Sequence, residues 1–345
     1  MAKLVDHPVL AYVRGLPAYQ QLLEQLREGG FKDQERFGLG LPRASRLAVL
    51  AGLHVDLQVP VVLLTNRADR ALELYDELSF WLPEGNNLYF PEPNPLFYEN
   101  LPWSQSTRRE RLHVLTELAK YLLPGAEPSA APPIIIAPIR AVMRRTVPRR
   151  DFLRASQRLS LGDRRDLQEL ARRWVGLGYQ YSNIVVQPGQ FSRRGGILDI
   201  WSPAEEMPVR IEFFGNEIDT LKHFDPSTQR TVNVLEKTFI FPASEALPMA
   251  AEKKGLLTEG LSEFEIPQLY DFPSSLMDYL PSQTLILLDG EEFVTAAIND
   301  IEEEAVARFQ SLVEQKALPE DFPLPYITWS EIEDSFTHHQ VLELG

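Results

Sequence analysis

The stretch GLPRASRL, from Gly40 to Leu47, has the spacing of a phosphate-binding loop, G-x-x-x-x-G-K-[S/T]. In such a loop the backbone N–H groups wrap the phosphates, the lysine reaches the β and γ oxygens, and the hydroxyl ligates Mg²⁺. Here Ser45 stands at the second glycine, Arg46 at the lysine and Leu47 at the hydroxyl position. Leucine cannot ligate a metal ion and Pro42 removes one N–H donor. The motif therefore indicates a degenerate nucleotide loop.

The carboxylate half of a nucleotide site belongs at the end of a buried strand, and TLILLDGEEF contains a suitable strand. Asp289 follows the apolar run, but Gly290 stands where a second acid would complete the pair, and Glu291 comes one residue late. The metal-binding and water-activating halves of the site are thus both altered. We expect no ATP hydrolysis and no cofactor for this chain. Weak anion binding by Gly40 and Arg46 is an alternative to a purely structural loop.

Other residue types that carry chemistry are few. The chain has no cysteine, which excludes thiol nucleophiles, disulfides and thiolate metal sites. It has six histidines. His338 and His339 are adjacent, and the sequence favours a solvated pair over a metal site. Glu212 and Glu217 lie on either side of a Gly-Asn turn, which favours solvated hairpin positions over a catalytic carboxylate pair. We therefore expect neither catalytic nor metal-binding residues.

Charge is distributed unevenly along the 345 residues. Residues 251–345 hold 20 Asp and Glu against 4 Lys and Arg, whereas residues 140–173 hold eleven arginines against four carboxylates. The basic segment indicates either solvated helix faces or a local anion-binding patch, and we expect the acidic region to interact with it. No run approaches the roughly 18 apolar residues of a membrane span, and the N-terminus has no secretory pattern. These features predict a cytoplasmic protein without membrane contacts.

In the first 148 residues strands and helices alternate, which predicts a parallel sheet with helices on its faces. Short unbroken apolar runs predict the buried strands, which are 59–66, 87–93 and 134–138. Amphipathic spacing predicts the helices, which are 18–30, 43–53, 67–82, 106–123 and 139–147.

The pattern changes after Pro148. A helix capped at Asp163 is followed by short strands with tight-turn signals at Gly195–Gly196 and Gly215–Asn216. This order predicts an α+β unit with an antiparallel sheet. The acidic remainder is helical apart from the strand in TLILLDGEEF, and its end predicts a strand in PYIT before a helix capped by Ser330. The predicted domains are 1–148, 149–242 and 243–345.

The stretch RIEFFGNEIDTLKHFDPSTQRT, from Arg210 to Thr231, closely resembles the N-terminal module of the bacterial transcription-repair coupling factor, Mfd. That module is itself related to the excision-repair helicase subunit UvrB. FSRRGGILDIWSP, from Phe191 to Pro203, fits the same pattern. Further matches are IIIAPIRAVMRRTVPRRDF, LMDYLPSQTLILLDGEEF and PYITWSEI, so the resemblance extends along nearly the whole chain.

The resemblance implies an α/β fold in which the first and third segments form a degenerate RecA-like, P-loop-like domain with a parallel sheet. The third segment packs back on the first, and an α+β domain with an antiparallel sheet is inserted between them. In the family this inserted domain docks the damage-recognition ATPase UvrA, and the nucleotide site of the module is dead. RNA polymerase, DNA, ATP and Mg²⁺ are bound by other domains, which would lie beyond Gly345. In the family the module also folds against the motor and holds it inactive.

The UvrB relative carries a long aromatic-rich hairpin that grips damaged DNA, and this chain has no room for one. Its aromatic residues in the corresponding region are Tyr89, Phe90, Phe97, Tyr98 and Trp103. They could form a base-stacking set. Because prolines are interspersed among them, the sequence favours core and loop anchors, and damage verification on DNA is not expected.

The resemblance also suggests which residues contact UvrA. Arg194 matches the arginine that precedes the family's glycine, Gln180 and Tyr181 fall where relatives place another arginine, and Ser192 replaces a third. Arg193 is a possible compensating contact. Trp201 has a residue type common at interfaces, although packing inside the domain is favoured. Strand alternation predicts two faces: Arg193, Ile197, Asp199 and Trp201 on one, and Arg194, Leu198 and Ile200 on the other.

We therefore expect a non-catalytic interaction module of a coupling factor, which recruits UvrA to stalled RNA polymerase and holds the motor inactive. One alternative is a nucleotide-dependent DNA-repair helicase subunit resembling UvrB, which Arg46, Leu47 and Gly290 argue against. A second alternative is a nucleic-acid-binding domain that uses the arginine-rich segment 140–173.

Overall fold

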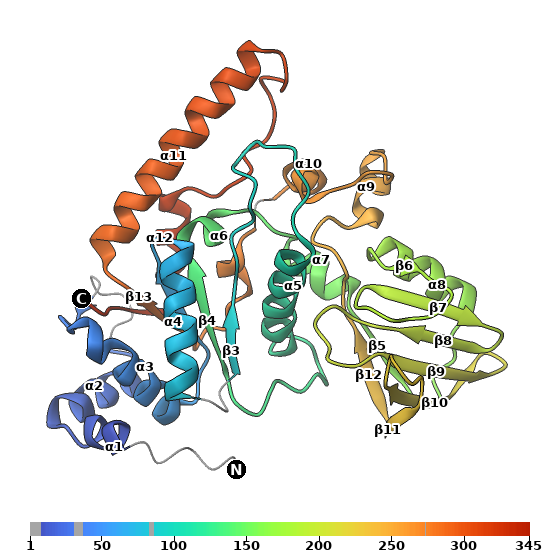
Figure 1. The fold of residues 1–345 in the computed structure, drawn as a ribbon, viewed down its shortest axis with the longest axis horizontal. Helices are drawn as coiled ribbons and strands as arrows, with labels where there is room; N and C mark the ends of the chain where they lie inside the picture. The colour runs from blue at the N-terminus through green and yellow to red at the C-terminus, as the bar shows by residue number, and fades with distance from the viewer. Residues whose placement is uncertain (1–7, 31–36, 83–85, 273) are drawn as a thin grey trace.

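A six-stranded, fully parallel sheet lies at the centre of the larger part of the molecule (Figure 1). The computed structural model describes residues 8–30, 37–82, 86–272 and 274–345, so the N-terminal residues 1–7 lie outside the description. The strand order is β1-β14-β13-β2-β4-β3. The strands are β1 (Phe37–Gly38), β2 (Val61–Thr65), β3 (Asn86–Tyr89), β4 (Pro133–Pro138), β13 (Leu285–Leu288) and β14 (Gln340–Glu343).

Helices cover both faces of this sheet, because alternate residues of its apolar strands point to opposite sides. Val61 and Leu63 pack in one core cluster with helices on one side of the sheet, and Val62 and Leu64 pack in the other cluster with different helices. On the first face lie α1 (Pro8–Arg14), α2 (Pro17–Glu28), α3 (Arg43–Leu57) and α4 (Ala68–Trp81). On the second lie α5 (Gln105–Lys120), α6 (Ile139–Met143), α11 (Glu291–Glu314) and α12 (Trp329–Phe336).

The third segment of the chain supplies two strands of this sheet. β13 lies between β2 and β14, and Leu285–Leu288 pairs in register with Val61–Leu64. The segment from 243 onward thus does more than pack against the first segment: the two build one domain, as the predicted fold class states. Removal of residues 251–345 would therefore take β13 and β14 out of the sheet.

The inserted part contains a second six-stranded sheet, with the order β11-β10-β9-β8-β7-β6. It is antiparallel except where β6 runs parallel to β7. Its strands are β6 (Gln180–Tyr181), β7 (Gln190–Arg194), β8 (Ile197–Ile200), β9 (Val209–Phe214), β10 (Glu217–Phe224) and β11 (Thr231–Leu235). α8 (Leu167–Gly176) packs on its inner face, and β5 (Gln157–Ser160) pairs with β12 (Lys237–Ile240).

Both predicted tight turns of this sheet are confirmed. β7 and β8 are joined by Gly195–Gly196, and β9 and β10 are joined by Gly215–Asn216. The first glycine of each turn has a positive φ, +60° at Gly195 and +64° at Gly215. Two-residue hairpin turns require this conformation, which glycine adopts at no steric cost.

Short connecting helices join the two parts. They are α7 (Arg149–Ala155), α9 (Pro248–Lys254) and α10 (Ile266–Leu269), with 3₁₀ turns at Glu263–Glu265 and Leu276–Tyr279. Figure 1 shows α7 between the main sheet and the inserted sheet, and α9 above the inserted sheet in this view.

Two predicted helix caps are wrong. The cap of α8 is Asp166, whose carboxylate accepts hydrogen bonds from the N–H groups of Gln168 and Glu169, whereas Asp163 accepts one from Ser160 in the preceding turn. The cap of α12 is Thr328 and not Ser330, because Thr328 and Glu331 have the spacing of a capping box and make both of its bonds.

The strand predicted in PYIT is also wrong. In that stretch only Tyr326 makes a β-bridge, to Arg144. The strand of this region is β14, a four-residue segment that follows α12 and that the sequence analysis missed together with the two-residue β1.

His339, predicted as solvated, is 6% exposed.

The predicted anchoring role of the aromatic residues after β3 is confirmed for four of them. Phe90, Phe97, Tyr98 and Trp103 are each at most 5% exposed and belong to the main core cluster. A side chain without accessible surface cannot stack on a nucleic-acid base.

Candidate functional site: the nucleotide loop and the inserted sheet

The backbone of the degenerate nucleotide loop is already hydrogen-bonded within the protein. The N–H of Leu39 donates to the carbonyl of Glu343, and the N–H of Leu41 donates to the carbonyl of Leu344, both at 2.8 Å. Pro42 has no N–H, and Ser45 donates to the carbonyl of Pro42. Within the loop, the N–H groups of Leu41 and Ser45 are therefore bonded to carbonyls of the protein itself and are not free for a phosphate.

Arg46 and Asp289, the two charged remnants of the predicted site, bind each other. The Nη1 of Arg46 lies 2.7 Å from Oδ1 of Asp289, and its Nε donates to the carbonyl of Leu41 at 3.1 Å. A second arginine, Arg70 of α4, places Nε 2.8 Å from Oδ2 of the same carboxylate. The three side chains are 11%, 5% and 17% exposed, in the order Arg46, Asp289, Arg70.

This triad leaves neither charged remnant available for a phosphate or a metal ion. Burial acts to lower the pKa of Arg70, but the hydrogen bond and charge of Asp289 outweigh it and raise that pKa. Leu47, at the position of the metal-binding hydroxyl, is 1% exposed and packs in the core beneath α3. Gly290 caps α11 with φ +86° and carries no side chain toward the loop.

Arg70 was missed by the sequence analysis. The sequence contained one indication of such a residue. Asp289 follows a buried strand, and a buried carboxylate needs a positively charged partner. The position of that partner could not be derived, because Arg70 and Asp289 are 219 residues apart in sequence.

The predicted distribution of side chains over the inserted sheet is wrong. In the β7–β8 hairpin Arg194 pairs with Ile197 and Ser192 pairs with Asp199, so these four residues share one face. Arg193 lies on the other face, opposite Leu198. The prediction assumed that alternation continues through the two-residue turn. The turn instead places Arg194 opposite Ile197, so odd-numbered residues of β8 share the face of even-numbered residues of β7.

The face that carries Arg194, here called the outer face, has a charge network across three strands. Oδ2 of Asp199 accepts hydrogen bonds from Arg194 and Arg210, both at 2.9 Å, and Oδ1 accepts from Nε of Arg210 at 2.7 Å. Asp199 is 1% exposed, Arg210 15% and Arg194 50%. The hydrogen bonds to Asp199 raise the pKa of Arg210. Arg194 is therefore both a local ion-pair partner and an exposed, oriented cation.

The other predicted contact residues differ in how much surface they offer. Gln180 and Tyr181 lie on the edge strand β6, and Tyr181 is 61% exposed with its ring against Phe191. Ser192 is 1% exposed, and Trp201 is 9% exposed in a small cluster with Val185 and Phe224. Trp201 therefore packs inside the domain, and it and Ser192 have little surface for a partner.

Glu212 and Glu217 are held in separate surface ion pairs, with Lys222 and Arg164 respectively. The hydrogen bond from Lys222 lowers the pKa of Glu212. Glu212 and Glu217 therefore do not form a catalytic carboxylate pair, because each carboxylate is bound to a different cation.

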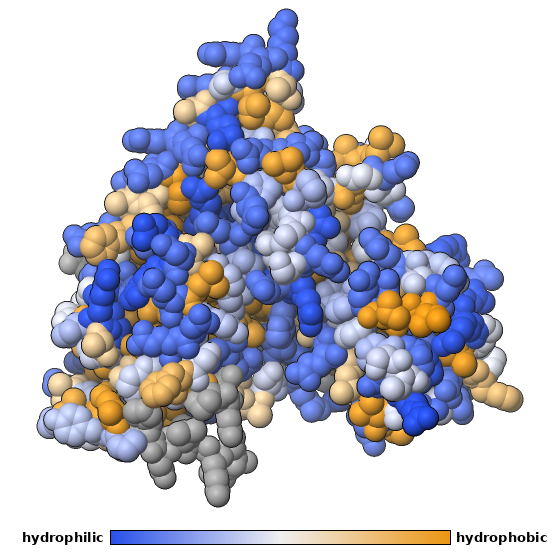
Figure 2. Space-filling view, viewed as in Figure 1, coloured by the Kyte–Doolittle hydropathy of each residue, from blue (hydrophilic) through white to orange (hydrophobic). Residues whose placement is uncertain are grey.

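Apolar side chains are exposed at the far end of the inserted sheet. Phe214 is 84% exposed, and Val232 and Val234 on the edge strand β11 are 52% and 67% exposed. Figure 2 shows orange apolar areas on this part of the molecule among hydrophilic surface. Val234 shares the outer face, because it pairs with Lys222 and Lys222 pairs with Arg210.

Among the described residues, no group of three or more histidine, aspartate or glutamate side chains has the geometry to hold a metal ion. None of the described helices is both long enough and apolar enough to span a bilayer.

Residues 158–245 match the UvrB interaction domain family, and this range contains the inserted sheet with Gln180, Tyr181, Arg193 and Arg194. The chain is also 26% identical, over 92% of its length, to the transcription-repair-coupling factor of Bacillus subtilis. The predicted resemblance to the N-terminal module of the transcription-repair coupling factors is confirmed. The coupling factor of Myxococcus xanthus is 34% identical over 68% of the chain, and that of Escherichia coli is 25% identical over 86%.

The chain spans less than a third of each of these coupling factors: 29% of the Bacillus, 19% of the Myxococcus and 27% of the Escherichia protein. The chain therefore belongs to the transcription-repair coupling factor family and corresponds to a part of these relatives.

Proposed function

We propose that this chain is a non-catalytic interaction module that recruits UvrA through the outer face of its inserted sheet. The observation that carries the proposal is Arg194, half exposed and oriented by the buried Asp199 in a domain of the UvrB interaction family. A guanidinium held in this way can meet a carboxylate of the partner through its free N–H groups. An oriented arginine loses less entropy on binding than a mobile one.

Arg194→Ala is expected to weaken UvrA binding by about 1–2 kcal/mol, the usual cost of truncating an interface anchor. Asp199 keeps Arg210 as a partner in the variant, so the sheet should stay folded. The measurement is a calorimetric titration with UvrA from the same organism. The matched control is Arg172→Ala, an exposed arginine of helix α8, which packs on the inner face of the same sheet. Equal losses in both variants would remove Arg194 from the interface.

The second part of the proposal is that the chain does not hydrolyse ATP. The hydrogen bond from the N–H of Leu41 to the carbonyl of Leu344 and the Arg46–Asp289 ion pair support it. A phosphate-release assay on the purified chain is expected to give no turnover above a boiled control. Turnover that is lost in an Asp289→Ala variant would contradict this assignment and favour the UvrB-like helicase.

We further propose that the module restrains the motor of the full-length factor, with RNA polymerase and DNA bound through other domains. A factor that lacks these residues should hydrolyse ATP faster than the intact one. Equal rates in the two proteins would exclude the restraint.

A further inference from the structure

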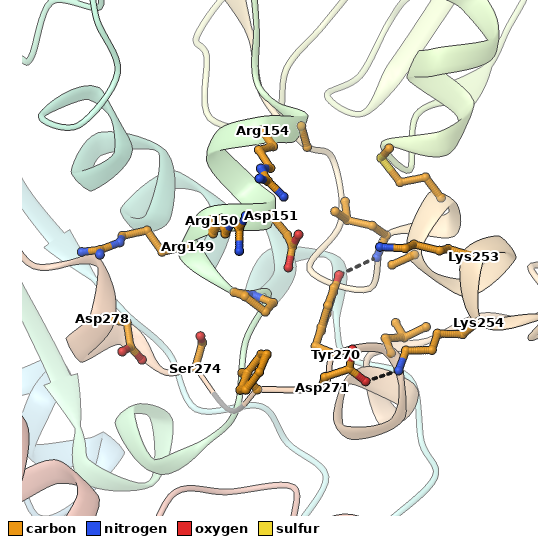
Figure 3. A pocket seen from close by; sticks show the side chains of 17 residues that line it. Arg149, Arg150, Asp151, Arg154, Lys253, Lys254, Tyr270, Asp271, Ser274 and Asp278 are labelled. Atoms are coloured by element: carbon orange, nitrogen blue, oxygen red, sulfur yellow. Dashed lines mark hydrogen bonds and ion pairs between the residues drawn. The ribbon is translucent and has the colours of Figure 1, made fainter.

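A cavity of about 620 Å³ lies where the two parts of the molecule meet, between α7, α9 and residues 269–272, 274 and 278. Its volume is within the range of small-molecule sites. Figure 3 shows that Arg150 and Arg154 of α7 approach it from one side and Lys253 of α9 from the other. The proposed UvrA contacts are absent from its lining.

The charge of the cavity is opposite to that of the protein. Five cationic side chains line it against three carboxylates, in a chain with a net charge of −15. Lys254 is paired with Asp271. Among the described residues, the side chains of Arg150, Arg154 and Lys253 have no hydrogen bond or ion pair. Three converging cations without partners are available to an anion.

The rest of the cavity wall is apolar. Leu269 and Met249 line it, and Phe272 on its rim is 79% exposed. The ring of Tyr270 is fixed as part of the wall, because its hydroxyl donates to the carbonyl of Glu245 at 2.8 Å and accepts from the N–H of Leu247 at 3.2 Å. An exposed aromatic ring beside cations suits a ligand that carries both a flat ring and a negative group.

We propose that this cavity binds a nucleotide, with its phosphates on Arg150, Arg154 and Lys253 and its base against Phe272 and the apolar wall. The nucleotide is either free or a unit of a single strand, since both present the same chemistry. An acidic peptide would satisfy the cations but would leave the aromatic side of the cavity without a role. The arginines belong to the basic segment 140–173, which the UvrA-docking role does not use.

Removal of the negative charge of Asp151 should change the affinity in the opposite direction to removal of the arginines. The carboxylate of Asp151 lies in the cavity beside Arg150 and opposite Tyr270 (Figure 3), and it makes no side-chain hydrogen bond or ion pair with the described residues. It repels a phosphate bound there. Asp151→Asn should therefore tighten binding by about threefold, whereas loss of the arginines should weaken it.

The test is calorimetric titration of the whole chain with ADP and with pyrophosphate, together with fluorescence anisotropy of a labelled oligo-dT of about 12 nucleotides. The double variant Arg150→Gln with Arg154→Gln is expected to weaken ADP binding about tenfold or more. Phe272→Ala should weaken ADP by about tenfold but leave pyrophosphate unchanged. All four side chains are surface-exposed or half-buried, so the variants should fold, and Arg194→Ala should bind nucleotide like the wild type.

The comparison of ADP with oligo-dT distinguishes a free nucleotide from a single strand as the ligand. ADP binding without oligo-dT binding identifies a free nucleotide, and tighter oligo-dT binding with competition by ADP identifies a strand. No binding of either probe at low salt overturns the proposal. Binding that the arginine pair and Asp151 do not change also overturns it, because the ligand would then lie elsewhere.

Discussion

Replacement of Glu245 by glutamine is expected to lower the free energy of unfolding by about 3–5 kcal/mol, the cost of breaking a buried ion pair. Oε1 and Oε2 of Glu245 accept hydrogen bonds from Arg111 at 2.7 and 3.1 Å, and the two side chains are 2% and 0% exposed. Because Arg111 is on α5 and Glu245 follows the inserted part, the pair joins the first segment of the chain to the beginning of the third. The neutral amide leaves a buried guanidinium without its counter-charge.

The neighbourhood of Arg111 increases this effect. Its guanidinium lies 4.1 Å from the ring centre of Phe90 and 4.9 Å from that of Trp103, and Arg144 approaches Trp103 as well, at 5.9 Å. Burial lowers the pKa of Arg144 to about 9, the charge of Arg111 adds to the shift, and Glu245 opposes it. Without Glu245 two buried cations share one aromatic cluster.

Urea unfolding followed by tryptophan fluorescence measures the change. Glu127→Gln is the matched control, since it removes an 81% exposed partner of Lys237 and should cost less than about 1 kcal/mol. The double variant Arg111→Met with Glu245→Leu should lose less than Glu245→Gln, because it removes both charges. If Glu245→Gln lost no more stability than the control, the pair would not stabilise the contact between the first and third segments.

Asp289→Ala is expected to cost about 3 kcal/mol of unfolding free energy, since two poorly solvated arginines lose the carboxylate they share. Arg46 keeps only the carbonyl of Leu41, and Arg70 keeps Glu73. The pairing also joins α3, α4 and the end of β13, which come from the first and third segments. Asp289, at the carboxylate position of the degenerate motif, thus stabilises the sheet that the two segments build together.

The control for this variant is Asp69→Ala. Asp69 is paired with Arg67, and both side chains are more than half exposed, at 62% and 70%. We expect a loss below about 1 kcal/mol. A loss at Asp289 no greater than this would show that the triad does not stabilise the fold, and that its three members pair only weakly in solution.

The sequence was sufficient for those elements whose signal is local. The buried strands β2, β4 and β13 follow from unbroken apolar runs, and the turns at Gly195 and Gly215 follow from glycine at positions of positive φ. The short strands β1 and β14 carry no distinctive local pattern, and their places depend on pairing: β14 pairs with β13, and β1 pairs with β14 at the edge of the sheet.

The candidate sites were predictable only in part, because their contacts are distant in sequence. Arg46, an altered position, and Asp289, a retained one, were both recognised in the degenerate motifs. However, 243 residues separate them, and nothing local shows that they bind each other. The relation of Arg194 to Asp199 is different. It could have been derived from the turn length, because a two-residue turn places residue 194 opposite residue 197 and brings 199 to the same face.

The central claim is that UvrA docks on the outer face of the inserted sheet, and amide hydrogen exchange of the chain with and without UvrA tests it most directly. The account predicts slower exchange for Gln180–Tyr181 and for the β7–β8 hairpin around Arg194 when UvrA is added. It predicts unchanged exchange in α3 and α4, which lie on the far sheet. Protection confined to α3 and α4, with none in the hairpin, would contradict it.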